Sequence, residues 1–512
     1  MNKTRFLALT VALLLALSPV LAAAEVLYPI AEEPVHLTYW MPLNSGAAKY
    51  ITSYDENYAY AKMQENTGVD IDWIHPAVGQ EKEQFDMMLL SNKHPDMIAM
   101  AHRYNGGEQQ GVRDGVFLDL TPYLEQWAPD YWALLQREDE FRRSVTDNEG
   151  NVAAFCAYKE PGDPQSVRLI VHQNVMESLK LDVPTTVDEW ENLFAAMLDM
   201  GATPYLLDAS GVSKIFVGAF GAYPGFYVNL DGAITYGYTT DAFRAYLEKM
   251  HDWYVKGYIN KDFTSIDGNT AKTKFDAGEL GCMADAIVGA YNRSMRKGNP
   301  ILSTPYPRLT KEQVLHWRDE NVSTRWMNYE NTTAISASCK NVEAAMKFLN
   351  YAYTDAGIEL LNWGVEGLNW SWVDGKRVYN DRMLKNEIYS TEEASYIYKA
   401  HFATKYTQRA TECHANLLAS PEALAIRFQY TDDPLQDTAF FLPTFNLDED
   451  DNLTKAEIMR NVETYVNEMV LKFIVGTEPL ESFDAYVEFI NAQGLPEVLE
   501  IMRRGYEQYM AK

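Results

Sequence analysis

The sequence is poor in the residues that build disulfide frameworks and metal centres. It has four cysteines in 512 residues and nine scattered histidines. None of the cysteines lies in a Cys-x-x-Cys pair, and no His-Glu-x-x-His occurs. These absences argue against a structural zinc site, a thioredoxin-like redox motif and a zinc hydrolase. We therefore expect no metal, no cofactor and four inert thiols.

Hydrolytic motifs are also scarce. Residues 211–215 begin like the Gly-x-Ser-x-Gly nucleophile elbow but lack its closing glycine. We expect no catalytic residue. One enzyme class stays open, because the two carboxylates of a glycoside hydrolase have no fixed spacing in sequence and the chain contains 72 acidic residues. A secreted glycoside hydrolase is thus an alternative interpretation.

Basic residues are outnumbered throughout the chain. There are 44 lysines and arginines against 72 aspartates and glutamates, a formal net charge of −28. A chain this acidic is repelled by phosphate backbones and by anionic lipid. Nucleic acid and membrane surfaces are therefore not expected as partners.

Long hydrophobic runs are missing after the N-terminus. Lys3 and Arg5 precede an apolar run at residues 6–17, and the small residues 22–24 precede Glu25. This pattern predicts a secretory signal peptide, residues 1–24, because the apolar run is too short for a membrane span of about 20 residues. The first cysteine is Cys156, so no lipid anchor is expected at the cleavage site. The mature protein is expected outside the cytoplasm, in a periplasm or at the cell surface.

The mature chain begins with a regular alternation of elements. We predict strands at 35–40, 69–74 and 96–100, separated by helices at 57–66 and 81–91. This order is typical of parallel βαβ units with helices on both faces of the sheet. Ligands of such sheets gather at the carboxyl ends of the strands, here near residues 40–44 and 100–105.

Residues 328–375 carry an ordered set of short signals. An Ala/Ser-rich strand at 334–338 is followed by a helix with two adjacent alanines, a Thr-Asp-Ala-Gly step at 354–357, a Gly-Val-Glu-Gly turn at 364–367 and several tryptophans. This order resembles the carbohydrate-binding branch of bacterial extracellular solute-binding proteins, which serve ABC importers. Residues 117–124 are similar to the Leu-x-Asp-Leu-Thr helix entry of that family, with Thr121 as the expected N-cap.

The resemblance implies an α/β fold with two lobes, the type II periplasmic-binding-protein-like fold. Each lobe would hold a mainly parallel sheet flanked by helices, and helices would extend the C-terminus. We expect lobe 1 to comprise residues 25–156 and 326–364, and lobe 2 residues 157–325 and 365–512. The chain would cross between the lobes near Cys156, Arg325 and Gly364.

The resemblance also implies a function. The protein would capture a sugar or an oligosaccharide and deliver it to the permease subunits of an ABC transporter. It would act as a monomer, catalyse no reaction and touch the membrane only through that complex. A sensory or peptide-binding protein of the same fold is the second alternative.

Sugar recognition requires aromatic faces for the apolar side of a pyranose ring and planar polar groups for its hydroxyls. Residues of both kinds occur near the expected binding edges and crossings. The candidate ligand-binding residues are Trp40, Asn44, His102, Arg103, Tyr104, Tyr223, Asp285, Arg325, Trp326, Trp363, Glu366 and Trp370. Other tryptophans lie at apolar helical spacing and are expected in the core: Trp127, Trp132, Trp190 and Trp253.

Three further patterns predict local structure. The Asp-Gly pairs at 231–232 and 374–375 predict hairpin turns. Thr185 or Thr186 is expected to cap the helix that follows it. The acidic residues 448–452 lack the glycine and the final glutamate of a calcium loop, so we expect the start of a helix with a capping box at Thr454.

Overall fold

The first sheet of the computed structural model has five strands in the order β2-β1-β3-β12-β4. These strands are β1 (Val35–Trp40), β2 (Val69–Ile74), β3 (Met97–Ala99), β4 (Phe155–Cys156) and β12 (Thr332–Ile335). β1 is parallel to β2 and to β3, while β12 is antiparallel to β3 and β4. Helices α1 (Tyr58–Thr67) and α2 (Glu81–Leu90) connect β1, β2 and β3. The predicted parallel βαβ units are confirmed.

The structure describes residues 26–91, 93–159, 167–205, 207, 214–266, 268–317, 332–400, 408–409 and 421–512. Further helices of the first half are α3 (Gly107–Arg113), α4 (Leu124–Trp127), α5 (Pro129–Arg137) and α6 (Asp139–Val145). We had expected Thr121, between α3 and α4, to cap the helical turn that it begins. The structure shows no such cap. The hydroxyl of Thr121 instead accepts a hydrogen bond from the backbone N–H of Val152.

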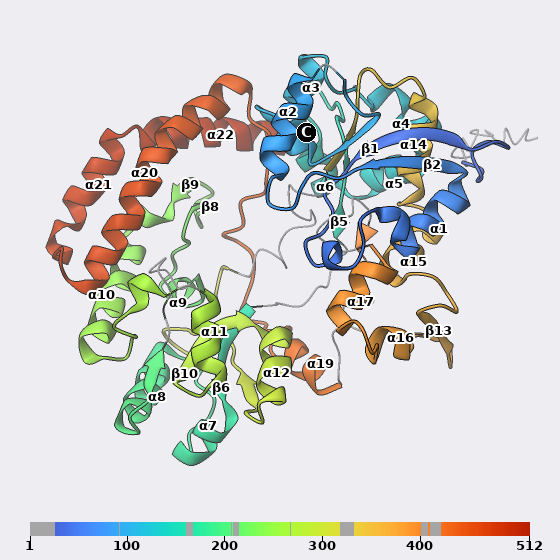
Figure 1. Ribbon diagram of the computed structural model, residues 1–512. Coiled ribbons are helices and arrows are strands. Elements are labelled where there is room, and N and C mark those ends of the chain that lie inside the picture. Colours follow the sequence, from blue (N-terminus) through green and yellow to red (C-terminus); the bar gives the residue numbers. More distant parts are fainter. Residues whose placement is uncertain are drawn as a thin grey trace, which may run out of the picture.

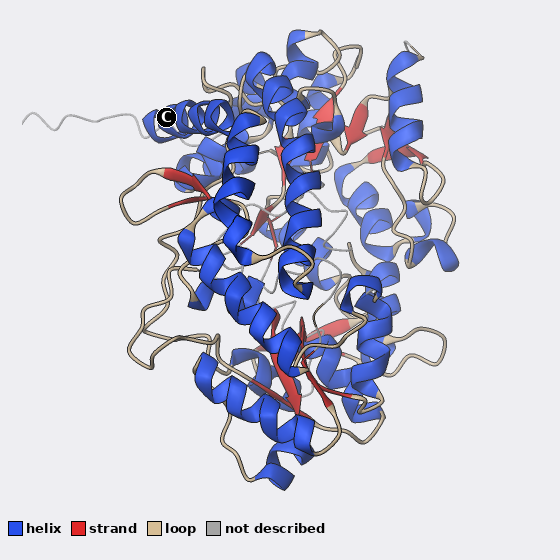
Figure 2. Ribbon diagram, turned by 90° about the vertical axis from the view of Figure 1, so that its left-hand side faces the viewer, coloured by secondary structure: helices blue, strands red, loops and turns tan. Residues whose placement is uncertain are grey.

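The second sheet has four strands in the order β11-β6-β10-β7. They are β6 (Val167–His172), β7 (Thr203–Tyr205), β10 (Leu280–Ala286) and β11 (Ile301–Ser303). β6 is antiparallel to β10 and β11, while β10 is parallel to β7. This sheet is therefore mixed, and the mainly parallel sheet that we expected in this lobe is wrong, because β6 runs against both of its neighbours. The helices of this part are α7 (Gln173–Leu179), α8 (Val187–Asp199), α9 (Lys214–Ala219), α10 (Asp241–Lys256), α11 (Gly268–Asp276) and α12 (Ile287–Arg296). Helices enclose the strands of both sheets (Figure 2).

Local sequence signals explain where these helices begin and end. Thr186 caps α8 and Glu189 returns the interaction in a capping box, as predicted. Gly257, with a φ of 81°, ends α10 in the left-handed conformation that glycine adopts without strain. The hairpin of β8 (Phe226–Val228) and β9 (Ile234–Tyr236) turns at the predicted Asp-Gly pair. Trp190 and Trp253 are buried in the second core, as expected.

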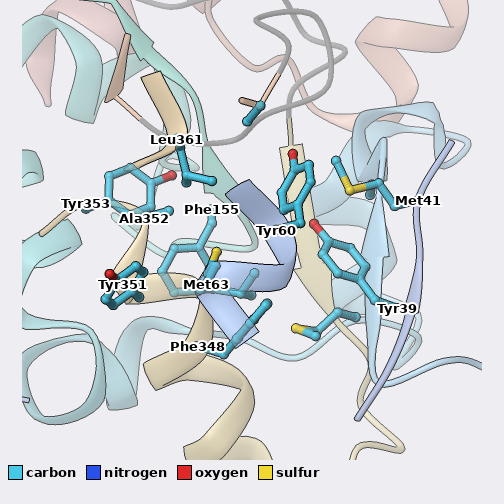
Figure 3. Close-up of a cluster of buried hydrophobic side chains, with 14 of the residues drawn as sticks. Tyr39, Met41, Tyr60, Met63, Phe155, Phe348, Tyr351, Ala352, Tyr353 and Leu361 are labelled. Atoms are coloured by element: carbon cyan, nitrogen blue, oxygen red, sulfur yellow. The ribbon is translucent and has the colours of Figure 1, made fainter. Parts of the chain in front are cut away.

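The first core is assembled from segments that are far apart in sequence (Figure 3). Helices α14 (Val342–Tyr351) and α15 (Asp355–Trp363) follow β12 and return to the first sheet. Side chains of β1, α1, β4 and α14 meet there, among them Tyr39, Met41, Tyr60, Met63, Phe155, Phe348 and Tyr351. We had expected the chain to return to lobe 1 at residues 326–364. The side chains of β12, α14 and α15 pack in this core, in agreement with that expectation.

The first core continues beyond the boundary that we expected at residue 364. Its members include side chains of β13 (Trp370–Val373), β14 (Lys376–Tyr379), α16 (Asp381–Leu384) and α17 (Thr391–Tyr398). Trp363 packs on Trp370 with ring centroids 5.9 Å apart, so residues 364–367 form a turn within one lobe. Residues 365–400 therefore pack with lobe 1, and the third crossing follows Ala400 instead of Gly364.

The linking segments lie close to one another where they are described. The first leaves β4 and forms β5 (Tyr158–Lys159), and the third includes β15 (Gln408–Arg409). β5 and β15 pair in parallel, so two crossings are joined by backbone hydrogen bonds. The third crossing leads to α19 (Pro421–Phe428), which packs on α12 of lobe 2.

The chain ends in the helices α20 (Glu449–Val475), α21 (Phe483–Ala492) and α22 (Leu495–Ala511). They form a layer along one side of the molecule, with α20 against α10 (Figure 1). Asp448 caps α20 by accepting a hydrogen bond from the N–H of Asp451, 2.9 Å away. The capping box that we expected at Thr454 is wrong, because the acidic residues before it are already helical.

Candidate functional site

Two crossings reach the first sheet at one edge. β1, β2 and β3 are parallel, so their carboxyl ends share that edge. Thr332, where the second crossing enters β12, pairs in register with Cys156, where the first crossing leaves β4. The binding edge predicted from the sequence is therefore also the edge from which the chain leaves for lobe 2.

The second sheet has a matching edge. Val167, where the first crossing enters β6, pairs with Ala286 at the carboxyl end of β10. Asp285 pairs in register with Arg168, one residue into each strand. In α/β proteins, ligands bind at the edge formed by the carboxyl ends of the strands. In both sheets this edge lies beside the segments that link the lobes.

The loop after β3 presents three consecutive polar side chains at this edge. Met100 has a φ of 59°, a left-handed conformation that a residue with a side chain adopts at an energetic cost. It redirects the chain so that the backbone N–H of His102 donates to the hydroxyl of Thr332 over 3.1 Å. His102, Arg103 and Tyr104 are all partly exposed there.

This loop combines an uncharged imidazole with a charged guanidinium. Burial lowers the pKa of His102 to about 4, and the neighbouring charge of Arg103 acts in the same direction. His102 is therefore uncharged at neutral pH, and its imidazole can both donate and accept a hydrogen bond. Tyr104 is held by its hydroxyl, which donates to a carboxylate oxygen of Asp114 over 2.8 Å.

Asn44 lies at the end of the loop after β1. Its side-chain oxygen accepts hydrogen bonds from the N–H groups of Gly46 and Ala47, at 2.8 and 3.2 Å. The phenol of Tyr54 donates to the carbonyl of Pro42 and accepts from the N–H of Asn44. Asn44 is partly exposed at a position that these bonds fix, with its amide oxygen engaged in the loop.

Three of the predicted tryptophans lie in the first core. Trp40 is 3% exposed, Trp363 2% and Trp370 0%. The ring of Trp40 packs edge-on against Phe85, with centroids 5.5 Å apart. None of these three rings offers a face to solvent in this conformation. Their contact with a ligand stays a prediction that the structure does not favour.

Trp372 differs from its neighbours in the same cluster. It is 49% exposed on the β13–β14 hairpin. The guanidinium of Arg377 lies 4.6 Å from its ring centre and is held by two hydrogen bonds to Glu359. The tryptophan cluster predicted from the sequence, Trp363, Trp370 and Trp372, was expected to supply at least one ring that stacks on the ligand, and Trp372 is its accessible ring.

Asp285 is buried at the edge of the second sheet. It is 6% exposed and receives a hydrogen bond from Arg293. Lys272 forms a second ion pair with it, at 3.6 Å. Arg293 also donates to Asp276 over 3.1 Å. This carboxylate is paired with two cations of its own lobe, which is the arrangement a buried charge requires.

Tyr223 is partly exposed before the β8–β9 hairpin. Its ring centroid lies 6.1 Å from that of Tyr227, which in turn lies 4.8 Å from that of Phe440. A Cβ at Gly237 would lie 1.7 Å from the carbonyl oxygen of Tyr223, so only glycine fits beside this backbone. The hairpin thereby fixes the position of an aromatic series in lobe 2.

Three candidate ligand-binding residues remain: Glu366, Arg325 and Trp326. Glu366 is exposed on the turn at residues 364–367. Arg325 and Trp326 lie outside the described residues. Thr332, whose hydroxyl accepts a hydrogen bond from the N–H of His102, was not predicted from the sequence.

The described residues contain neither a cluster of metal ligands nor a membrane-spanning helix. No group of three or more His, Cys, Asp or Glu side chains in this part of the chain could hold a metal ion. Cys156, Cys282 and Cys339 are buried thiols outside any disulfide, and burial raises the pKa of each. None of the helices that the structure describes is long and apolar enough to cross a bilayer.

Two α/β lobes, linked by adjacent crossings at the edges predicted to bind ligand, define the class of solute-binding proteins with the type II periplasmic-binding fold. The sequence profile of the bacterial extracellular solute-binding protein family matches residues 48–359. The chain belongs to this family.

Characterised relatives are distant. The chain is 24% identical over 241 residues to the polygalacturonan/rhamnogalacturonan-binding protein YtcQ of Bacillus subtilis, covering 44% of this chain and 46% of the relative. It is 23% identical to a carbohydrate ABC transporter substrate-binding protein of Streptococcus pneumoniae, covering 61% and 62%. The chain thus spans less than two thirds of these two relatives. The fructooligosaccharide ABC transporter substrate-binding protein FusA of the same species is 19% identical, with 89% and 88% covered.

Solved structures show the same fold. FusA of Streptococcus pneumoniae in complex with kestose superposes with a TM-score of 0.73 at 16% identity, covering 93% of this chain and 99% of the other. The alginate-binding protein AlgQ2 superposes with a TM-score of 0.71 at 20% identity, with 93% and 99% covered.

Proposed function

We propose that this protein binds an oligosaccharide outside the cytoplasm and delivers it, chemically unchanged, to the permease subunits of an ABC transporter. Family membership supports capture of a solute. The relatives' names support the carbohydrate class, because they specify polygalacturonan, rhamnogalacturonan and fructooligosaccharides. In this proposal residues 1–24 are a signal peptide, the mature protein is a monomer, and no lipid anchor is needed.

The observation that supports the proposal is the row of polar side chains in the loop after β3, at the carboxyl edge of the first sheet. In the proposed site, lobe 1 would contribute the neutral imidazole of His102 together with Arg103 and Tyr104, and lobe 2 would contribute Tyr223. Polar groups of this kind bind hydroxyls, while an aromatic ring covers the apolar face of a sugar. Because the groups come from both lobes, a ligand that contacts them all would favour closure of the lobes.

The site proposed here is narrower than the set predicted from the sequence. Asn44 would border it, and Arg325 and Trp326 stay predictions for the second crossing. Glu366 would lie at its margin. Trp40, Trp363 and Trp370 would support lobe 1 from its core, and Asp285 would act through its ion pairs, because these four side chains are buried.

A thermal-shift screen tests this function. Kestose, nystose, oligogalacturonides, rhamnogalacturonan fragments and alginate oligosaccharides would be compared, with chromatography of each sugar after incubation. We expect at least one sugar to raise the melting temperature and to be recovered intact. For a ligand with micromolar affinity at 100 times its Kd, the added stability is about 3 kcal/mol.

The same screen, extended with peptides and followed by an uptake assay in cells that lack the gene, separates the alternatives. A glycoside hydrolase would release new reducing ends over hours. A peptide-binding protein would respond to peptides and ignore every sugar. A sensory protein would bind the sugar but would not restore uptake of that sugar in a cell that lacks the corresponding gene. Each of these outcomes would refute the part of the proposal that it addresses.

A further inference from the structure

Helix α22 belongs to lobe 2 at its beginning and touches lobe 1 at its end. Leu495, Val498 and Met502 are part of the second core. A helix of 17 residues is about 25 Å long, which is long enough to leave one lobe and reach another. Figure 1 shows α22 running from the helical layer on the left to the C-terminal end beside lobe 1.

The end of α22 packs on α6, a helix of lobe 1. Phe141 and Val145 of α6 are buried in the first core. Phe141 also packs edge-on against Tyr158 of the crossing strand β5, with ring centroids 5.2 Å apart. The contact between α6 and α22 is therefore made beside the segment that connects the lobes.

Tyr509 is the centre of this contact. Its ring is buried, although it belongs to neither of the two large cores. Its hydroxyl donates to the carbonyl of Glu140 over 3.4 Å, and the guanidinium of Arg143 lies 6.0 Å from its ring centre. On the other side the ring meets Phe445, at 6.3 Å between centroids. One aromatic side chain is thus enclosed by both lobes.

Hydrogen bonds surround this ring. The ammonium of Lys512 donates to the carbonyls of Thr146 at 2.7 Å and Arg143 at 3.4 Å, where the last turn of α6 leaves carbonyls without helical partners. The side chain of Asn148 donates to Gln508 over 2.9 Å. The ammonium of Lys512 is partly buried, and this burial lowers the pKa of Lys512 to about 8.

A second segment of lobe 2 reaches the same place. Asn446, just before α20, donates to the carbonyl of Thr146 over 3.2 Å. The adjacent residues Phe445 and Leu447 lie so close to Gly505 of α22 that a Cβ there would meet them at 2.4 to 2.6 Å. Residues 445–447 and 508–512 therefore form one unit, which we name the C-terminal brace.

We infer that the C-terminal brace is a non-covalent link between the lobes that restricts their relative motion, independently of the covalent crossings. Linking segments alone allow the lobes to bend and to twist. A further contact beside β5 opposes the twist and leaves a hinge-like closure, which is the motion that brings two binding edges together. The inference concerns the motion of the lobes and does not depend on which solute is bound.

Pulsed electron–electron resonance between spin labels on the two lobes tests the brace. Labels at Lys385→Cys on lobe 1 and Lys297→Cys on lobe 2 use exposed positions. The background carries Cys413→Ser, because Cys156, Cys282 and Cys339 are buried. The test variant is Tyr509→Ala with Lys512→Ala. The matched control is Arg503→Ala, whose partners Glu500 and Glu507 lie on α22 itself.

In the ligand-free protein we expect the test variant to give a distance distribution roughly twice as wide as that of the parent, and the control to match the parent. If circular dichroism shows that the alanine pair does not fold, Tyr509→Phe with Lys512→Met is measured in its place, with broadening still expected. This pair keeps the apolar contacts and removes the hydrogen bonds. A folded variant whose distribution superposes on that of the parent would overturn the inference.

Discussion

The two lobes differ in how their binding edges are held. In lobe 1 the edge consists of loops fixed by backbone hydrogen bonds, such as the one from His102 to Thr332. In lobe 2, ion pairs hold Asp285 at the end of β10, and the close contact of Gly237 with Tyr223 fixes the segment before the β8–β9 hairpin. Lobe 1 thus presents polar side chains in set positions, while lobe 2 holds the aromatic ring of Tyr223 beside a rigid hairpin.

This difference suggests a division of tasks. Hydrogen bonds to hydroxyls depend on direction and therefore discriminate between sugars, whereas an aromatic face accepts many rings. We expect changes in lobe 1 to alter selectivity and changes in the lobe 2 hairpin to alter affinity for all ligands alike.

The largest expected effect on stability comes from removing a buried tryptophan of lobe 2, compared with a more exposed tryptophan of lobe 1. Trp253→Ala removes a fully buried ring that packs edge-on against Phe194 and Phe216, with centroids 5.1 and 5.0 Å away. The expected loss is about 3–5 kcal/mol in the free energy of unfolding, measured by urea denaturation. The matched change Trp372→Ala, at the half-exposed ring of lobe 1, should cost only about 1 kcal/mol, because it loses the contacts with Arg377 and Trp370. Equal losses would show that burial does not distinguish the two tryptophans.

A glycine substitution tests the rigid hairpin. In Gly237→Ala the new methyl group would overlap the carbonyl oxygen of Tyr223 and push this residue from its position. Overpacking of this kind costs about 1–3 kcal/mol of stability. Sugar affinity, measured by calorimetry, should fall with it. Gly232→Ala in the same hairpin is the control, because a Cβ there would meet no atom within 4 Å. Its φ of 81° still strains alanine, so unchanged sugar affinity is the informative comparison.

His102→Ala tests the edge of lobe 1. It should weaken binding of the best sugar by about tenfold, which corresponds to roughly 1.4 kcal/mol, because a hydrogen bond to a hydroxyl is lost. The melting temperature without ligand should barely change, since the side chain is only partly buried. His102→Asn should retain part of the affinity. Normal binding by both variants would remove His102 from the proposed site.

The smallest expected effect concerns acid stability of lobe 2. Burial on its own raises the pKa of Glu191, but hydrogen bonds from Lys256, Lys249 and Trp253 outweigh it and lower the pKa to about 2. Because the folded pKa lies below the unfolded value, this stability is present above about pH 4.5 and is lost as the pH falls toward 2. Glu191→Gln should cost about 1 kcal/mol at pH 7, allowing for solvent screening, and nothing at pH 2. A loss that is equal at both pH values would contradict this origin.

Much of lobe 1 could be predicted because its signals are local. The strands at 35–40 and 69–74 have the predicted bounds, since apolar alternation and Gly68 define them within the segment itself. The end of lobe 1 could not be predicted. Nothing near Gly364 shows that Trp370 packs on Trp363, because that contact depends on a core shared with distant segments.

The candidate site shows the same limit. A tryptophan at the end of a strand, such as Trp40, has the same sequence pattern whether its ring faces a ligand-binding site or the core. Phe85, a residue of α2, decides the outcome by packing on that ring. His102 to Tyr104 could be found because the loop after a parallel strand always lies at the binding edge. The directions of these three side chains could not be predicted, because they depend on contacts with distant residues such as the hydrogen bond from His102 to Thr332.

Small-angle X-ray scattering during titration with the sugar panel tests the central claim most directly. The account predicts that one oligosaccharide reduces the radius of gyration as the two lobes close on it, and that the sugar is recovered unchanged afterwards. A radius of gyration that stays constant with the sugar that binds most tightly would contradict it.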